Sequence, residues 1–167
     1  MAHAVETMAY AGQVPWHTLG TKVDGDLAPA EFMKEAGLDW NVVSVPAYAD
    51  FNGKKIHSGH EMLIRESDGI PLTMITGAWN PVQNADAFEF FGDFCEAGAM
   101  TMETAGSLRG GQWVWVLAKS TESFSLFGGD DVDSYLLFSN PHIYGRGIDI
   151  QFTPVRVVCN NTLNLSL

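Results

Sequence analysis

The side-chain types in this sequence that could bind a metal are not spaced as a metal site requires. His57, His60 and Glu61 form an H-x-x-H-E run. Zinc proteases need two histidines four residues apart on one helix face, whereas a spacing of three on a strand directs the rings to opposite faces. The acidic stretch 130–133 lacks the glycine and the final glutamate of a calcium loop. We therefore predict no metal site and no cofactor.

Signatures of phosphate binding and of nucleophilic catalysis are also missing from the sequence. It contains neither G-x-x-x-x-G-K-[ST] nor G-x-G-x-x-G, and the glycine-rich run 106–111 joins two expected strands. No helix N-terminus would face a phosphate there. The sequence has no G-x-S-x-G elbow, and neither Cys95 nor Cys159 has a neighbouring histidine. We predict no catalytic residues and two buried, inert thiols.

Charge limits the partners that the chain can bind. Nine Lys and Arg residues stand against 20 Asp and Glu residues, which gives a net charge of −11. An acidic chain repels nucleic acid at long range, so a nucleic-acid site would need a local basic patch. Tryptophans beside such a patch would stack single-stranded bases. The residues predicted to bind nucleic acid are Arg109, Arg146, Arg156, Lys54, Lys55, Trp113 and Trp115.

An alternative interpretation assigns the two tryptophans to the protein core. Trp113 and Trp115 share one face of an expected strand, and Val114 and Val116 share the other. Apolar residues on both faces are typical of a central strand that is buried on both sides.

The sequence shows no sign of export or of membrane insertion. Its first seven residues lack a basic and an apolar region, and no apolar run reaches the length of about 18 residues that a membrane helix needs. Two cysteines without C-x-x-C spacing indicate a reducing compartment. We therefore expect a cytoplasmic protein without membrane partners.

The elements that would position these residues are strands, hairpins and two helices. A short helix is expected to begin at Asp26 and end at Gly37. A second, amphipathic helix is expected over 84–97, N-capped by Asn84 and ended by Gly98, with an apolar stripe facing a sheet and an acidic stripe facing water. The apolar stripe comprises Ala87, Phe88, Phe91, Phe94 and Cys95.

Strands surround the amphipathic helix in the sequence. The first is expected over 40–48, and runs 61–66 and 71–76, joined by Asp68-Gly69, predict a hairpin. Later strands are expected over 100–107, 112–119, 123–127 and 133–138, and a last pair of strands over 148–159, with Pro154 at a bend or edge. We predict an α+β fold: a curved, largely antiparallel sheet, one main amphipathic helix at about 84–97 packed on a face, and β-hairpins after that helix.

The chain divides into three expected parts. Residues 1–25 are expected to form an irregular N-terminal arm that Trp16 anchors by burial, and residues 26–159 to form a single α+β core domain. Residues 160–167 would begin a truncated C-terminal helix. A helix this short is unstable alone, so we expect a fragment of a longer protein.

Five phrases of the sequence carry a family resemblance. They are PWHTLG (15–20), AGLDW (36–40), NPVQN (80–84), AGSLRGG (105–111) and TPVRVVCNNTL (153–163). They resemble the phage/plasmid-like protein family that carries domain of unknown function 932, along nearly the whole chain. The resemblance implies a mobile-element origin, a bacterial host and a longer protein with a charged helical half. It supplies no catalytic residues.

Three functions remain open at this point. The first is a phage- or plasmid-encoded accessory protein of DNA metabolism, acting as a single-stranded DNA binding or annealing module. The order of strand, hairpin and helix is similar to that of phage single-strand annealing proteins. Convergence of Arg109, Arg146 and Arg156 on one groove would favour this function, and scatter would count against it.

The second function is a noncatalytic module of a mobile element that oligomerises or binds another phage or host protein. The acidic balance and the many phenylalanines and methionines favour it. The third is an uncharacterised hydrolase or transferase, which no motif supports.

Overall fold

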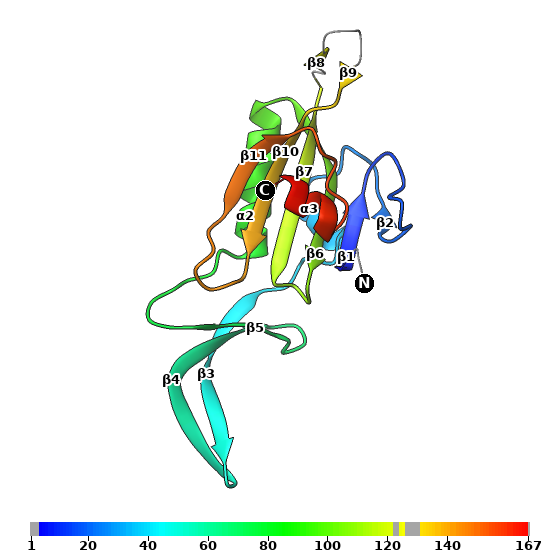
Figure 1. Cartoon of the computed structure of the whole chain (residues 1–167). Coiled ribbons are helices and arrows are strands. Elements are labelled where there is room, and N and C mark those ends of the chain that lie inside the picture. Colours follow the sequence, from blue (N-terminus) through cyan, green and yellow to red (C-terminus); the bar gives the residue numbers. More distant parts are fainter. Residues whose placement is uncertain (1–3, 122–123, 126–130, 167) are drawn as a thin grey trace.

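The computed structural model describes residues 4–121, 124–125 and 131–166 of the chain (Figure 1). Its elements in chain order are β1 (Val5–Tyr10), β2 (Thr21–Lys22), α1 (Pro29–Glu35), β3 (Val42–Phe51), β4 (Lys54–Arg65), β5 (Pro71–Ile75), α2 (Asn84–Ala97), β6 (Met100–Leu108), β7 (Trp113–Ser120), β8 (Phe124–Ser125), β9 (Asp131–Val132), β10 (Tyr135–Pro141), β11 (Asp149–Thr153) and α3 (Asn160–Ser166). The predicted α+β fold is confirmed.

A six-stranded sheet forms the body of the molecule. Its strand order is β11-β10-β7-β6-β1-β2, and every pairing is antiparallel except that of β1 with β2. Helices α1 and α2 pack on one face, where Phe32, Phe88 and Phe91 are buried against the sheet. The segment 157–158 and α3 cover the opposite face, as Figure 1 shows. The sheet is therefore buried on both sides.

The expectation of an irregular N-terminal arm is wrong for two of its segments. Strand β1 pairs antiparallel with β6, and β2 adds to β1. Met8, Ala9 and Tyr10 are all buried, so two covered faces hide the alternation that would have marked a strand. Trp16, expected to anchor the segment by burial, is 65% exposed. His17 holds the segment instead, because its Nε2 donates to the carbonyl oxygen of Val158 at 2.8 Å.

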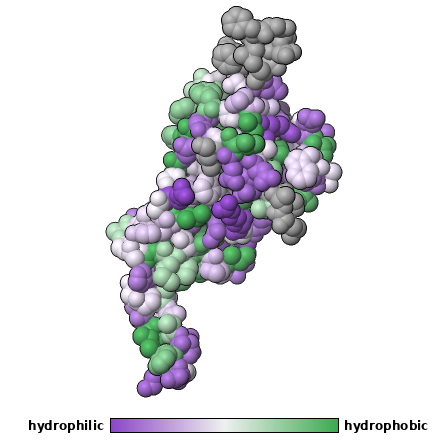
Figure 2. Space-filling model, viewed as in Figure 1, coloured by the Kyte–Doolittle hydropathy of each residue, from purple (hydrophilic) through white to green (hydrophobic). Residues whose placement is uncertain are grey.

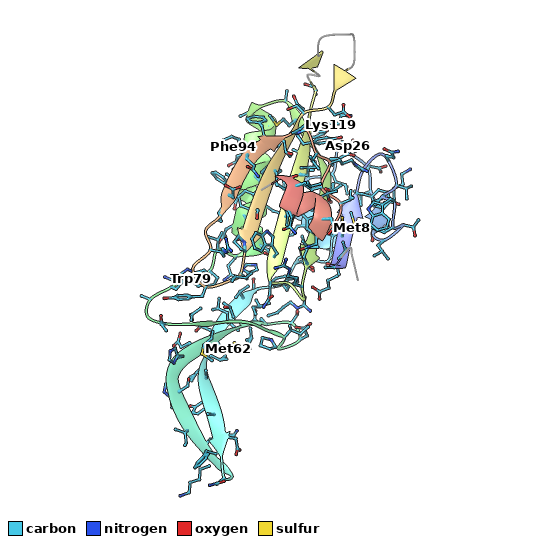
Figure 3. All side chains as sticks on the ribbon, viewed as in Figure 1. Met8, Asp26, Met62, Trp79, Phe94 and Lys119 are labelled. Atoms are coloured by element: carbon cyan, nitrogen blue, oxygen red, sulfur yellow. The ribbon has the colours of Figure 1, made fainter. Side chains whose placement is uncertain are left out.

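Helix α2 has the predicted bounds, but two of its residues behave differently from the prediction. Gln83 is the N-cap, although its side chain bonds to the backbone of Val42 rather than to the helix, and Asn84 is buried in the first turn. Phe94 was expected to face the sheet and is 48% exposed. It lies on the flank of the helix that points toward β10 and β11, 5.7 Å from the ring of Phe90 (Figure 3). The helix therefore leaves part of its apolar surface open.

Several other elements begin or end at residues other than those predicted. Helix α1 begins at Pro29 rather than at Asp26, and it ends before Gly37, whose φ of +68° favours glycine. Strand β11 ends before Pro154 and forms one edge of the sheet. The expected hairpin of 123–127 with 133–138 is only partly right. Two-residue strands β8 and β9 pair with each other, and their turn lies outside the described residues. The second expected strand instead corresponds to β10, which pairs with β7 and β11 in the six-stranded sheet. No helix in the described part of the chain is long and apolar enough to span a membrane.

Candidate interaction surface

Strands β3 and β4 form a two-stranded extension that points away from the six-stranded sheet (Figure 1). Asn52 and Gly53 join the strands with φ values of +52° and +73°, the geometry of a type I′ turn. Asp50 accepts a hydrogen bond from the Gly53 N–H at 3.2 Å. Strand β5 pairs with β4 only between Glu61 and Ile64. Residues 47–60, called the arm below, therefore form a hairpin without a third strand.

The arm exposes apolar and basic side chains together. Tyr48, Phe51 and Ile56 are all at least half exposed, and both lysines of the turn, Lys54 and Lys55, are exposed as well. Figure 2 shows apolar and polar side chains mixed at the end of the arm. A two-stranded hairpin with no covering layer is marginally stable in water. By the pairing register, Phe51 and Ile56 lie on one face of the hairpin and Tyr48 lies on the other. Exposed apolar residues of this kind are typical of an interaction site.

The charge of the arm differs in sign from that of the whole chain. Lys54 and Lys55 outnumber Asp50, the one carboxylate of residues 47–60, which leaves +1 with both histidines neutral. The whole chain carries −11. The arm is therefore a basic and apolar projection from an acidic protein.

The histidines of the arm make local contacts. The ring of His57 lies 5.3 Å from that of Tyr48, and its Nδ1 accepts from the Gly59 N–H at 3.2 Å. His60 Nδ1 lies 3.0 Å from the carbonyl oxygen of Ser58. Among the described residues, no group of three or more His, Cys, Asp or Glu is arranged to hold a metal ion.

A buried arginine anchors the base of the arm to the body. Arg65, at the end of β4, donates to Glu6 of β1 at 2.8 Å and to Asp68 at 2.5 Å, and its guanidinium lies 5.3 Å from the centre of the Trp40 ring. The two carboxylates raise the pKa of Arg65, and Arg65 lowers the pKa of Asp68. This network fixes the β4–β5 turn, which the Asp68-Gly69 signal predicted, against β1.

Side chains of β5 and of the following loops complete the junction. Gln112 donates to the carbonyl oxygen of Leu72 at 2.6 Å, and the hydroxyls of Thr76 and Tyr144 lie 2.7 Å apart. Trp79 packs edge-on against Tyr144 with ring centres 6.2 Å apart, beside the junction (Figure 3). The arm thus extends from a base with several tertiary contacts.

A buried polar network lies close to this base and was not foreseen from the sequence. Asn84 donates to the carbonyl oxygen of Leu38 at 3.0 Å, and its Oδ1 accepts from His142 Nε2 at 3.0 Å. Burial lowers the pKa of His142 to about 4, so the ring is neutral near pH 7. The network joins the start of α2, the end of β10 and the segment that leads into β3.

Four of the cations predicted to bind nucleic acid lie at one end of the molecule. Lys54 and Lys55 are at the tip of the arm. Arg109 lies in the β6–β7 turn, where it donates to Asn160 Oδ1 at 3.0 Å, and Arg146 is exposed in the β10–β11 loop. Both loops are at the end of the sheet from which the arm extends (Figure 1).

Arg156 is bound elsewhere, so the three arginines do not converge on one groove. Its Nε donates to Glu103 at 2.7 Å, and its Nη2 donates to the carbonyl oxygens of Ala11 and Gln13 at 3.2 and 2.7 Å. This arginine holds the segment after β1 in place, and Glu103 neutralises its charge. The convergence that would favour a nucleic-acid groove is absent.

The two tryptophans of β7 differ in what they can contact. Trp115 is fully buried, and its Nε1 donates to Thr104 Oγ1 at 3.3 Å. Trp113 is half-buried and donates to Ser139 Oγ at 2.6 Å. Because β7 is a central strand covered on both faces, Trp115 is unavailable for base stacking, which corrects that expectation. The alternative interpretation as core is right for Trp115.

A groove between α1 and α2 forms a second surface of interest. Its volume is about 550 Å³. It is lined by Ala28, Pro29, Ala30, Met33, Ala85, Phe88, Glu89, Gly92, Asp93 and Glu96. A Cβ on Gly92 would lie 2.4 Å from Pro29 Cγ, so this glycine allows the two helices to approach. The floor of the groove is apolar, and three exposed carboxylates form its rim.

Comparison with known protein families gives one match. Residues 71–167 match the domain of unknown function DUF932, and they make up more than half of the chain. The chain therefore belongs to the DUF932 family, as the resemblance in the sequence indicated. Comparison with the curated proteins and with the solved structures gives no match.

Proposed function

We propose that this member of the DUF932 family is a noncatalytic module that binds a protein partner through its arm. The observation that carries the proposal is the exposure of Tyr48, Phe51 and Ile56 on a hairpin that extends beyond the body. Exposed aromatic and aliphatic side chains are the groups that dominate the binding energy of protein interfaces when a partner covers them. The anchored base favours binding, because a pre-positioned arm loses less entropy when it docks.

The state of the cysteines supports a binding rather than a catalytic role. Cys95 and Cys159 are buried. Burial raises the pKa of Cys95 to about 11, so this thiol is protonated near neutral pH and is a poor nucleophile. The sequence resemblance to phage/plasmid-like proteins adds a setting to the proposal, in which the module serves a mobile element in the cytoplasm of its bacterial host.

Site-specific photocrosslinking tests whether the arm docks. Benzoylphenylalanine is placed at Phe51 and, as a matched control, at Phe152, which are 65% and 67% exposed. Both full-length variants are irradiated in cells that express the protein. We expect protein adducts from position 51 and few from position 152. The proposal is overturned if position 51 gives no adduct.

A second candidate function is binding of single-stranded DNA by the same end of the molecule. Residues 51–60 contain two lysines, two histidines and no carboxylate, and Arg109 and Arg146 lie at that end of the sheet. Fluorescence anisotropy with a labelled oligonucleotide, measured over a range of salt concentrations, tests this candidate. It predicts binding that weakens as salt rises and that the K54E/K55E variant loses. Absence of binding by the full-length protein at low salt removes it.

A further inference from the structure

Resting on the proposed docking role of the arm, we infer that its partner is a second copy of this chain. The tip of the arm, residues 51–56, would occupy the α1–α2 groove of the next molecule. The chains would then assemble head to tail.

The groove selects a particular kind of occupant. Its floor contains Met33 and Phe88, and its rim contains Glu89, Asp93 and Glu96. The rim repels nucleic acid and acidic peptides, and it attracts a cationic segment that also carries apolar side chains. Its volume of about 550 Å³ lies within the range of about 300–1,000 Å³ that is typical of binding pockets.

The tip of the arm has the complementary composition. Phe51 and Ile56 supply exposed apolar groups, and Lys54 and Lys55 supply two positive charges beside the turn. Three of the seven other Lys and Arg residues of the chain are less suited to this role. Arg65, Lys119 and Arg156 already form ion pairs with carboxylates of their own chain. The tip therefore combines two adjacent lysines with exposed apolar side chains.

The arm of one molecule does not reach the groove of the same molecule. Strand β3 has ten residues and spans about 33 Å, and it leaves the body at the end of the sheet remote from most of α2 (Figure 1). Strand β5 pairs with β4 just beyond the arm, and the arm points away from α2. Occupation of the groove by the tip must therefore be intermolecular.

Such a contact joins two different surfaces of the chain. An interface of this kind does not close on itself in a dimer by two-fold symmetry, so it generates rings or open chains. Salt weakens it, because charge pairs at an exposed rim are screened.

Charge reversal on each side of the contact gives a specific test. The variants are K54E/K55E at the tip, E89K/D93K at the rim, and the quadruple variant that carries both changes. The matched control is E31K/E35K, which reverses two carboxylates of α1 that do not line the groove. Sedimentation velocity and light scattering at low salt measure the mass of each full-length protein against 18.2 kDa for one chain.

The inference predicts a distinct pattern of masses. The unchanged protein and the E31K/E35K control assemble, and each double variant at the contact associates about tenfold or more weakly. A mixture of the two double variants assembles again, because an acidic tip then fits a basic rim and a basic tip fits an acidic rim. The quadruple variant assembles on its own for the same reason.

Two outcomes overturn the inference. One is an unchanged protein that remains at the mass of a single chain at all concentrations and at low salt. The other is assembly that both double variants retain. If position 51 still crosslinks to a different protein in either case, the proposed function stands and only the identity of the partner is wrong. If position 51 crosslinks to nothing, both proposals fail.

Discussion

The arm and the six-stranded sheet differ in how their strands are covered. In the body, helices cover one face of the sheet and α3 with the preceding segment covers the other, so β7 is buried from Val114 to Ala118. In the arm, residues 48–59 are exposed on both strands. The two regions have the same backbone pairing and opposite relations to solvent. The buried contacts that stabilise the fold therefore lie in the body, and the arm carries the exposed apolar side chains on which the proposed docking rests.

The largest effect that separates the two regions is expected from loss of a phenylalanine ring. Phe91 is fully buried between α2 and the sheet, whereas Phe51 is exposed on the arm. F91A should lower the free energy of unfolding by about 3–5 kcal/mol, because it removes apolar burial and leaves a cavity. F51A should change it by less than about 0.5 kcal/mol. Urea denaturation of both variants measures the difference, and equal losses would contradict the division between body and arm.

A change in pH should alter the free energy of unfolding by about half as much, through protonation of His142 in the body. Its pKa is about 4 in the folded protein because burial penalises the charged ring, against 6.5 in the unfolded chain. As pH falls below the unfolded value, the unfolded chain takes up a proton that the folded one does not. The stabilisation that the neutral His142 gives the folded protein is therefore fully present above pH 6.5. It is lost as the pH falls from 6.5 toward the folded pKa of about 4. Between about pH 7.5 and pH 5 the loss should be about 2 kcal/mol.

The H142Q variant isolates this contribution. Glutamine keeps a donor near Asn84 and cannot take up a proton in this range. Urea denaturation at both pH values should show a larger loss in the unchanged protein than in the variant. If both lose the same stability, His142 is not the group responsible.

The body shows which features the sequence can predict. Helix α2 was located to the residue because its apolar and acidic positions separate at helical spacing and Gly98 follows it. Strand β1 was missed because both faces of its second half, Met8 to Tyr10, are buried, which removes the alternation that marks a strand. Its place depends on pairing with β6, about a hundred residues later, and no local pattern records that. The sequence predicted Asn84 as the N-cap, but its side chain is buried and bonds to His142. His142 lies 58 residues later in the chain, so no local pattern indicates this contact.

The arm was missed although the sequence contains its signal. Asn52-Gly53 is the dipeptide most typical of a two-residue hairpin, and residues on both sides of it favour strands. The length of β4 was hidden by His57, Ser58 and Gly59, which interrupt any apolar alternation. The placement of the three arginines could not be predicted either. Arg156 contacts Glu103 only because the chain after β11 crosses the sheet.

A smaller and local effect is expected at the turn of the arm. Gly53 has a φ of +73°, and nothing lies within 4 Å of the place where a Cβ would be. The cost of G53A is therefore backbone strain alone, about 1 kcal/mol. It should appear as faster amide hydrogen exchange in the arm, with exchange in β7 unchanged. Equal acceleration in both regions would show that the arm unfolds together with the body.

The smallest effect on stability is expected for K54E/K55E, the variant on which the binding experiments depend. Both lysines are exposed at the tip, and no ion pair among the described residues involves them. Their reversal should change the free energy of unfolding by less than about 0.5 kcal/mol, because surface charges away from pairs contribute little. The same substitution should weaken docking about tenfold or more. Urea denaturation and sedimentation of one preparation measure both quantities, and a loss of stability as large as the loss of docking would contradict the separation of the two regions.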